Sequence, residues 1–121
     1  IPLLMSGCII IRGGWTVRTN QPPEVKLVEP LDVIVLDTER QAVTVQFTDP
    51  DEEALVFTWL IDGDPAPPGD VATFSSRVNE RTVWTSRAFV RLPAVQDGSL
   101  VACTVTDGEA VTRVDWTVEV P

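Results

Sequence analysis

The sequence contains no histidine and no tyrosine among its 121 residues. Histidine is the usual general base and a common metal ligand, and tyrosine supplies a phenolic acid. Without them most catalytic mechanisms are excluded. Asp49 and Asp51 form a carboxylate pair on a turn with no apolar pocket beside it to raise a pKa, and Cys103 has no histidine to activate it. We therefore predict a protein that is not an enzyme and holds no organic cofactor.

Basic residues are scarce as well, with 9 lysines and arginines against 18 aspartates and glutamates, for a net charge of -9. Binding to a phosphate backbone requires clustered basic side chains, so nucleic acid is excluded as a partner. The length suits one domain with a full hydrophobic core.

Long helical patterns are missing too, and from residue 22 to the end short β-prone runs alternate with turn residues. This pattern predicts an all-β fold, an antiparallel sandwich or barrel of seven to eight strands. Residues 62–69, rich in proline and glycine, are expected to form a rigid loop without a strand. The expected strands are residues 25–28, 33–36, 42–48, 55–61, 72–78, 82–92, 99–106 and 112–120.

Alternation along these strands predicts the side chains that point into the core. Trp59 lies between Phe57 and Ile61 on one face of its strand, and Cys103 and Trp116 hold similar positions in the last two strands. These three residues, Trp59, Cys103 and Trp116, are the predicted centre of the core.

The segment Leu4-Met5-Ser6-Gly7-Cys8 resembles a bacterial lipobox. The resemblance implies that residues 1–7 are the remnant of a signal peptide and that Cys8 carries the lipid that anchors the protein to a membrane. A free or disulfide-bonded Cys8 is the alternative. Residues 8–21 would then be a linker or an extra N-terminal strand, and residues 22–121 the folded domain.

Trp59 and the late segment from Asp97 to Val105 together resemble the immunoglobulin-like superfamily. In that fold a tryptophan on strand C packs on a cysteine of strand F. The resemblance implies an immunoglobulin-like β-sandwich with Trp59 packed on Cys103. Because Val45 or a neighbour occupies the position of the second cysteine, Cys103 is expected to be a buried, unpaired thiol.

Several motifs are also similar to the bacterial Ig-like, PKD-like and cadherin-like domains of cell-surface proteins. This similarity implies a place in the bacterial envelope, at the outer membrane or cell surface. The motifs are Pro22-Pro23, Asp49-Pro50-Asp51, Trp59, Val105-Thr106-Asp107-Gly108 and Trp116-Thr117-Val118-Glu119-Val120.

Acidic residues cluster in the expected B–C and F–G loops, which in this fold lie at the same end as the N-terminus. Ca²⁺ binds several carboxylate and carbonyl oxygens in a forgiving geometry. The candidate calcium ligands are Asp49, Asp51, Glu52 and Asp107. A solvated acidic loop is the alternative.

Four arginines fall in one short region, at positions 77, 81, 87 and 91. Charge pairing with acidic residues on neighbouring strands is the expected role, and a binding patch for an acidic partner is the alternative.

The sequence thus favours a non-enzymatic lipoprotein module of the envelope with a structural or protein-binding role. An unidentified protein partner would bind turns far from the membrane, at residues 37–41, 62–70 and 93–98. One alternative is a self-assembling, homo-oligomeric surface or filament subunit in which residues 1–17 add a strand to a neighbouring copy. The other is a calcium-dependent adhesion module.

Overall fold

The computed structural model of the protein describes residues 10–12, 15–17 and 20–121. The lipobox, Cys8 and residues 1–7 lie outside these described residues. Strands β2 (Ile10–Arg12) and β3 (Trp15–Val17) pair with each other in an antiparallel sheet of two strands. Within the described residues, no helix is long and apolar enough to cross a membrane.

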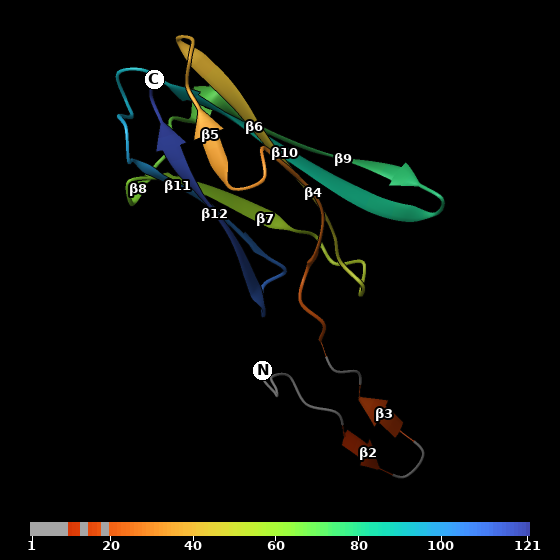
Figure 1. Ribbon diagram of the computed structural model, residues 1–121. Coiled ribbons are helices and arrows are strands. Elements are labelled where there is room, and N and C mark those ends of the chain that lie inside the picture. Colours follow the sequence, from red (N-terminus) through yellow and green to blue (C-terminus); the bar gives the residue numbers. More distant parts are fainter. Residues whose placement is uncertain (1–9, 13–14, 18–19) are drawn as a thin grey trace.

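The rest of the chain folds into two sheets, as Figure 1 shows. The first has the order β4 (Glu24–Glu29), β6 (Arg40–Thr48), β10 (Arg81–Arg91) and β9 (Val71–Val78). The second has the order β5 (Val33–Val35), β12 (Val111–Glu119), β11 (Leu100–Thr106), β7 (Val56–Ile61) and β8 (Asp64–Pro65). All paired neighbours are antiparallel except β5 and β12, so the predicted all-β antiparallel sandwich is confirmed.

The prediction of a strand-free loop at residues 62–69 is wrong. Residues 64 and 65 form β8, which pairs with the end of β7, and the 3-10 helix η1 (Pro68–Asp70) follows. Asp62 and Gly63 both have positive φ, at 49° and 87°, as a two-residue hairpin turn requires. Pro65 is tolerated because β8 lies at the edge of its sheet.

Alternation along the strands produces the core, because every second side chain of a strand points toward the opposite sheet. Trp59 and Trp116 stack at 5.5 Å between ring centroids, with 16° between their planes. The fully or almost fully buried apolar residues around them are Ile34, Leu36, Val43, Val45, Phe47, Leu55, Ala88, Val90, Val95, Val101, Cys103, Val105 and Val118.

The two ends of the sandwich differ in composition (Figure 1). At one end the chain enters the domain beside the β6–β7 loop and the β11–β12 loop, which carry most of the clustered carboxylates. We call this end the acidic end. The turns at residues 37–41, 62–70 and 93–98 lie at the other end, together with the C-terminus, and we call them the distal loops.

Candidate functional site

The acidic end is built on a tight turn that follows β6. The carboxylate of Asp49 accepts a hydrogen bond from the backbone N–H of Asp51 at 2.8 Å, and the backbone carbonyl of Asp49 accepts one from Glu52 at 2.9 Å. This is the local bonding that favours Asp at the start of a turn. Glu52 then adopts a left-handed conformation with φ of 58°, which re-aims the chain before β7.

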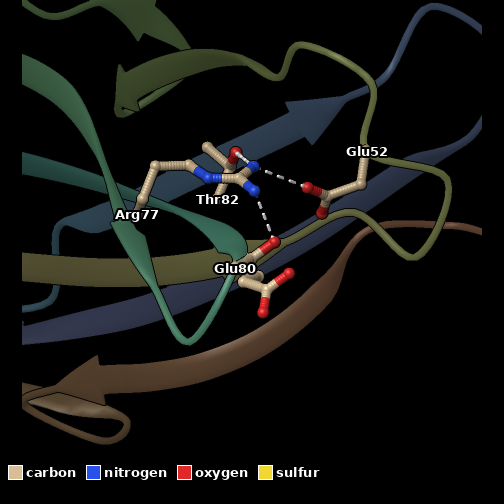
Figure 2. Close-up of polar contacts among 4 residues, drawn as sticks. All are labelled: Glu52, Arg77, Glu80 and Thr82. Atoms are coloured by element: carbon tan, nitrogen blue, oxygen red, sulfur yellow. Dashed lines mark hydrogen bonds and ion pairs between the residues drawn. The ribbon is translucent and has the colours of Figure 1, made fainter.

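Because of that turn, successive carboxylates point in different directions. Oxygen atoms of Asp49, Asp51 and Glu53 lie within 4.8 Å of one another. Glu52 instead contacts Arg77 of β9, with 3.2 Å between carboxylate and guanidinium (Figure 2). Among the ligands predicted from sequence, Asp49 and Asp51 therefore come together, whereas Glu53 occupies the place expected for Glu52.

Asp107, the fourth predicted ligand, organises the β11–β12 loop. One of its carboxylate oxygens accepts hydrogen bonds from the backbone N–H groups of Glu109 and Ala110, both at 2.8 Å. The other accepts a bond from the side-chain amide of Asn20 at 2.9 Å. Both oxygens of Asp107 are thus already engaged by the protein.

Residues 20 and 21 of the chain that enters the domain are fastened to this end by hydrogen bonds. Besides the contact of Asn20 with Asp107, the backbone N–H of Gln21 donates to the Asp51 carboxylate at 2.8 Å. From the sequence, residues 20 and 21 are expected only to end a linker or an extra N-terminal strand. No local pattern reveals a partner 87 residues away, so only the fold brings Asn20 to Asp107.

Burial and mutual repulsion disturb the titration of these carboxylates. Asp49 is 1% exposed, and its second carboxylate oxygen has no hydrogen-bond partner within the described residues. Burial raises the pKa of Asp49, and the charges of Asp107, Asp51 and Glu52 raise it further, against the backbone bond from Asp51. The expectation that this turn has no surroundings able to raise a pKa is therefore wrong for Asp49, because the fold buries its carboxylate. The pKa of Glu53 is raised by burial and then by Asp107 and Asp49.

Asp107 shows the opposite behaviour. Burial raises its pKa, but the hydrogen bonds from Ala110, Glu109 and Asn20 outweigh that effect and hold the pKa below the ordinary value. At the acidic end, hydrogen bonds therefore stabilise the ionised form of Asp107, whereas the surroundings of Asp49 and Glu53 oppose their ionisation.

Cys103, one of the predicted core residues, is buried and unreactive. Cys103 is fully buried and stands directly opposite Trp59 in the β7–β11 register, while Val45 is buried on β6. Burial raises the pKa of the Cys103 thiol to about 12. A thiol protonated to this extent is a poor nucleophile and metal ligand.

The arginines do not form a single patch. Arg77 contacts Glu52 of the β6–β7 turn, and Arg91 pairs with Asp70 of η1 at 2.8 Å. Both arginines thus pair with carboxylates, but these partners lie in a turn and a 3-10 helix and not on neighbouring strands as predicted. Arg91 also stands opposite Arg40, a like-charged neighbour that the sequence did not single out. Both guanidiniums lie near the ring of Phe89, at 5.8 Å and 4.6 Å from its centroid.

The sheet orders decide the fold class. Strands β4, β6, β10 and β9 reproduce the order A-B-E-D, and β12, β11 and β7 the order G-F-C, of an immunoglobulin sandwich. The fold is immunoglobulin-like. The fourth constant immunoglobulin domain of nurse shark IgNAR matches 84% of this chain over 97% of its own, at a TM-score of 0.62 and 17% identity.

A second solved structure agrees with this immunoglobulin-like assignment. The N-terminal Ig1-2 module of Drosophila receptor protein tyrosine phosphatase DLAR matches 84% of this chain at a TM-score of 0.52 and 13% identity. This chain spans half the length of that module. At such identities the similarity establishes the fold alone. No protein-family model and no curated protein matches the sequence.

Proposed function

We propose that this immunoglobulin-like chain is a non-enzymatic module of a bacterial envelope, anchored through a lipid on Cys8, which holds or positions a protein partner. The observation that carries the proposal is the fastening of residues 20 and 21 to the acidic end by the bonds to Asp107 and Asp51. These bonds fix the end at which the anchored segment enters. The distal loops then face away from the membrane.

The distal loops are suited to binding because side chains hold them in place. Asp62 accepts a hydrogen bond from the backbone N–H of Leu100 at 2.9 Å, and Asp97 accepts one from Val120 at 3.0 Å. The ion pair of Asp70 with Arg91 fixes η1 against β10. A surface that is ordered before binding loses less conformational entropy when a partner docks.

The anchor is tested by the intact mass of the native protein and by its partition between membrane and soluble fractions. We expect a chain that starts at a lipid-modified Cys8, and release to the soluble fraction in a Cys8→Ser variant. A Cys103→Ala variant is the matched control and should stay in the membrane fraction. An unmodified native chain that begins before Cys8 would refute the anchor.

The orientation is tested separately with fluorescent labels on introduced cysteines. Ala94→Cys places a label on an exposed distal loop, and Glu109→Cys places one on the exposed tip of the acidic end. In vesicles with spin-labelled headgroups, we expect the label at position 109 to be quenched several-fold more than the label at position 94. The reverse order of quenching would show that the proposed orientation is wrong.

Calcium-dependent adhesion is the second candidate, and the unpartnered buried oxygen of Asp49 favours it. A divalent cation beside Asp49, Asp51 and Glu53 would satisfy that oxygen and offset the carboxylate repulsion that, together with burial, raises the pKa values of Asp49 and Glu53. These three residues would hold the ion, and Asp107 would add its charge from outside the ligand set.

Calorimetric titration with CaCl2 and the melting temperature test this candidate. Binding should release or absorb heat and stabilise the fold, by about 2.7 kcal/mol at a calcium concentration of 100 times Kd. Asp49→Asn should abolish both effects, while Glu52→Gln, whose carboxylate contacts Arg77, should keep them. If CaCl2 produces no heat of binding and no change in melting temperature, calcium binding is excluded.

A further inference from the structure

Strand β9 is the least protected sheet edge in the described part of the chain. Its eight residues pair with β10 in an unbroken register, and they include no proline, no glycine and a single charged residue, Arg77. On its other side no strand of the described residues is a neighbour. Natural proteins usually interrupt such edges with charges, prolines, bulges or very short strands, because unpaired N–H and C=O groups recruit other strands.

The other edges of the sandwich carry those interruptions. The register of β4 shifts between Val25 and Leu27, and β4 also carries Glu24, Lys26 and Glu29. Edge strand β5 has three residues and β8 has two, one of them a proline. The part of β12 that extends beyond β5 carries the ion pair of Arg113 with Asp115. The contrast makes β9 a distinct feature rather than a general property of the fold.

Strand β9 also exposes two large apolar side chains to solvent. Phe74 and Val78 are 52% and 51% exposed, and both lie on the outer face of the sheet, opposite Thr85 and Arg81 of β10. In Figure 1 the β9–β10 hairpin reaches beyond the strands of the other sheet. The edge is therefore accessible along its length.

The charges of β9 favour a second copy of this chain over an acidic peptide. Its one cation, Arg77, already contacts Glu52, Thr82 and the backbone carbonyl of Glu80 (Figure 2). Strand β9 itself therefore offers no unengaged positive charge that would select an acidic strand. Two copies with a net charge of -9 each repel one another over most of their surfaces. Strand β9 holds no carboxylate, so two copies can approach there.

We propose that two copies associate by antiparallel pairing of their β9 strands about a two-fold axis at Phe74. In this register Phe74 meets Phe74 of the second copy, Thr73 meets Ser75, Ala72 meets Ser76 and Arg77 meets Val71. Residues on the same face of each sheet meet, no like charges stand opposite, and an aromatic pair lies on the axis. The symmetry closes at a dimer and joins the two four-stranded sheets into one. The pairing does not depend on the lipid anchor or on calcium.

Analytical ultracentrifugation of the full chain in a Cys8→Ser background tests the dimer. We expect a concentration-dependent dimer that is weakened at least about tenfold by Phe74→Lys, because a charge on an edge strand opposes pairing. Val56→Lys is the matched control, since Val56 is 60% exposed on a strand of the other sheet, and it should leave the dimer unchanged. A monomer at every concentration, or equal dimers in all three proteins, would overturn the proposal.

Oxidative cross-linking in the same background tests the register and does not depend on the lysine variants. Phe74→Cys should form a disulfide-linked dimer across the axis. Ser76→Cys should not, because position 76 meets position 72 of the second copy. Efficient cross-linking through position 76 with none through position 74 would refute the register, and capture of a different protein by β9 with no dimer would refute the choice of a second copy.

Discussion

At the residue scale, one polar network connects the two sheets through the core. The indole N–H of Trp59 donates to the hydroxyl of Ser86 at 2.8 Å, and Ser86 shares a second hydrogen bond of 2.8 Å with Thr73. Ser86 is fully buried. A tryptophan can sit in the middle of an apolar core only when its N–H finds an acceptor there. Ser86 therefore permits the position of Trp59.

Replacing Ser86 by alanine should destabilise the fold by about 1–3 kcal/mol, because the buried indole N–H loses its acceptor. Ser76→Ala, on an exposed position of β9, is the control and should change the free energy of unfolding by less than about 0.5 kcal/mol. Urea denaturation measures both. A loss for Ser86→Ala no larger than for the control would show that the hydrogen bond contributes nothing.

Cys103 should behave as a small apolar side chain and not as a reactive thiol. With a pKa of about 12, on the order of one molecule in 10⁴ carries the thiolate at pH 8. In a Cys8→Ser background, a disulfide reagent at pH 8 should leave the folded protein unmodified and react fully once urea unfolds it. Modification of the folded protein at the rate of a free cysteine would contradict the burial of Cys103.

At the element scale, the β9–β10 hairpin contains a local conflict between sequence and conformation. Its two turn residues, Asn79 and Glu80, have φ of 50° and 64°. A two-residue hairpin turn of this type prefers Asn-Gly, and Glu pays a steric penalty in the left-handed region. The guanidinium of Arg77 donates to the backbone carbonyl of Glu80 at 2.6 Å and so stabilises the turn from its side (Figure 2).

Glu80→Gly should therefore stabilise the domain by roughly 0.5–1 kcal/mol, since glycine removes the steric penalty while the carbonyl that Arg77 binds remains. Asn79→Gly should gain less, because asparagine tolerates the left-handed region well. Thermal unfolding of the two variants beside the parent protein provides the comparison. Destabilisation by Glu80→Gly would mean that the turn is not strained.

The same scale explains how much the sequence could predict. The strands and their buried faces followed from alternation, which is a local property, and Trp59, Cys103 and Trp116 are all buried. Strand β8 was missed because Pro65 within it and the prolines after it made residues 62–69 read as a loop and concealed the Asp62-Gly63 turn. At the acidic end, one left-handed residue decides that Glu53 and not Glu52 joins Asp49, and no periodic pattern encodes that choice.

At the scale of the whole molecule, the uneven distribution of charge determines the dependence of stability on pH. Asp49 and Glu53 have raised pKa values in the folded state, so the folded protein binds more protons than the unfolded chain above the ordinary values of 3.8 and 4.5. The stability that protonation gives is complete below those values and is lost as pH rises through the raised ones. Asp107 has a lowered pKa, so its contribution is present above 3.8 and is lost as pH falls through the lowered value.

The free energy of unfolding should therefore pass through a maximum in mildly acidic solution, close to the ordinary carboxylate range, and fall on both sides. Urea denaturation at constant ionic strength from pH 3 to pH 8 would locate it. Asp49→Asn should flatten the decline of the free energy of unfolding toward neutral pH, because the side chain at position 49 no longer ionises. Asp107→Asn should lower the free energy of unfolding most near neutral pH, because the ionised Asp107 stabilises the parent protein there. Since the two variants change the curve in opposite directions at neutral pH, a common shift of both would indicate general repulsion within a chain of net charge -9 and not the two local environments described for these carboxylates.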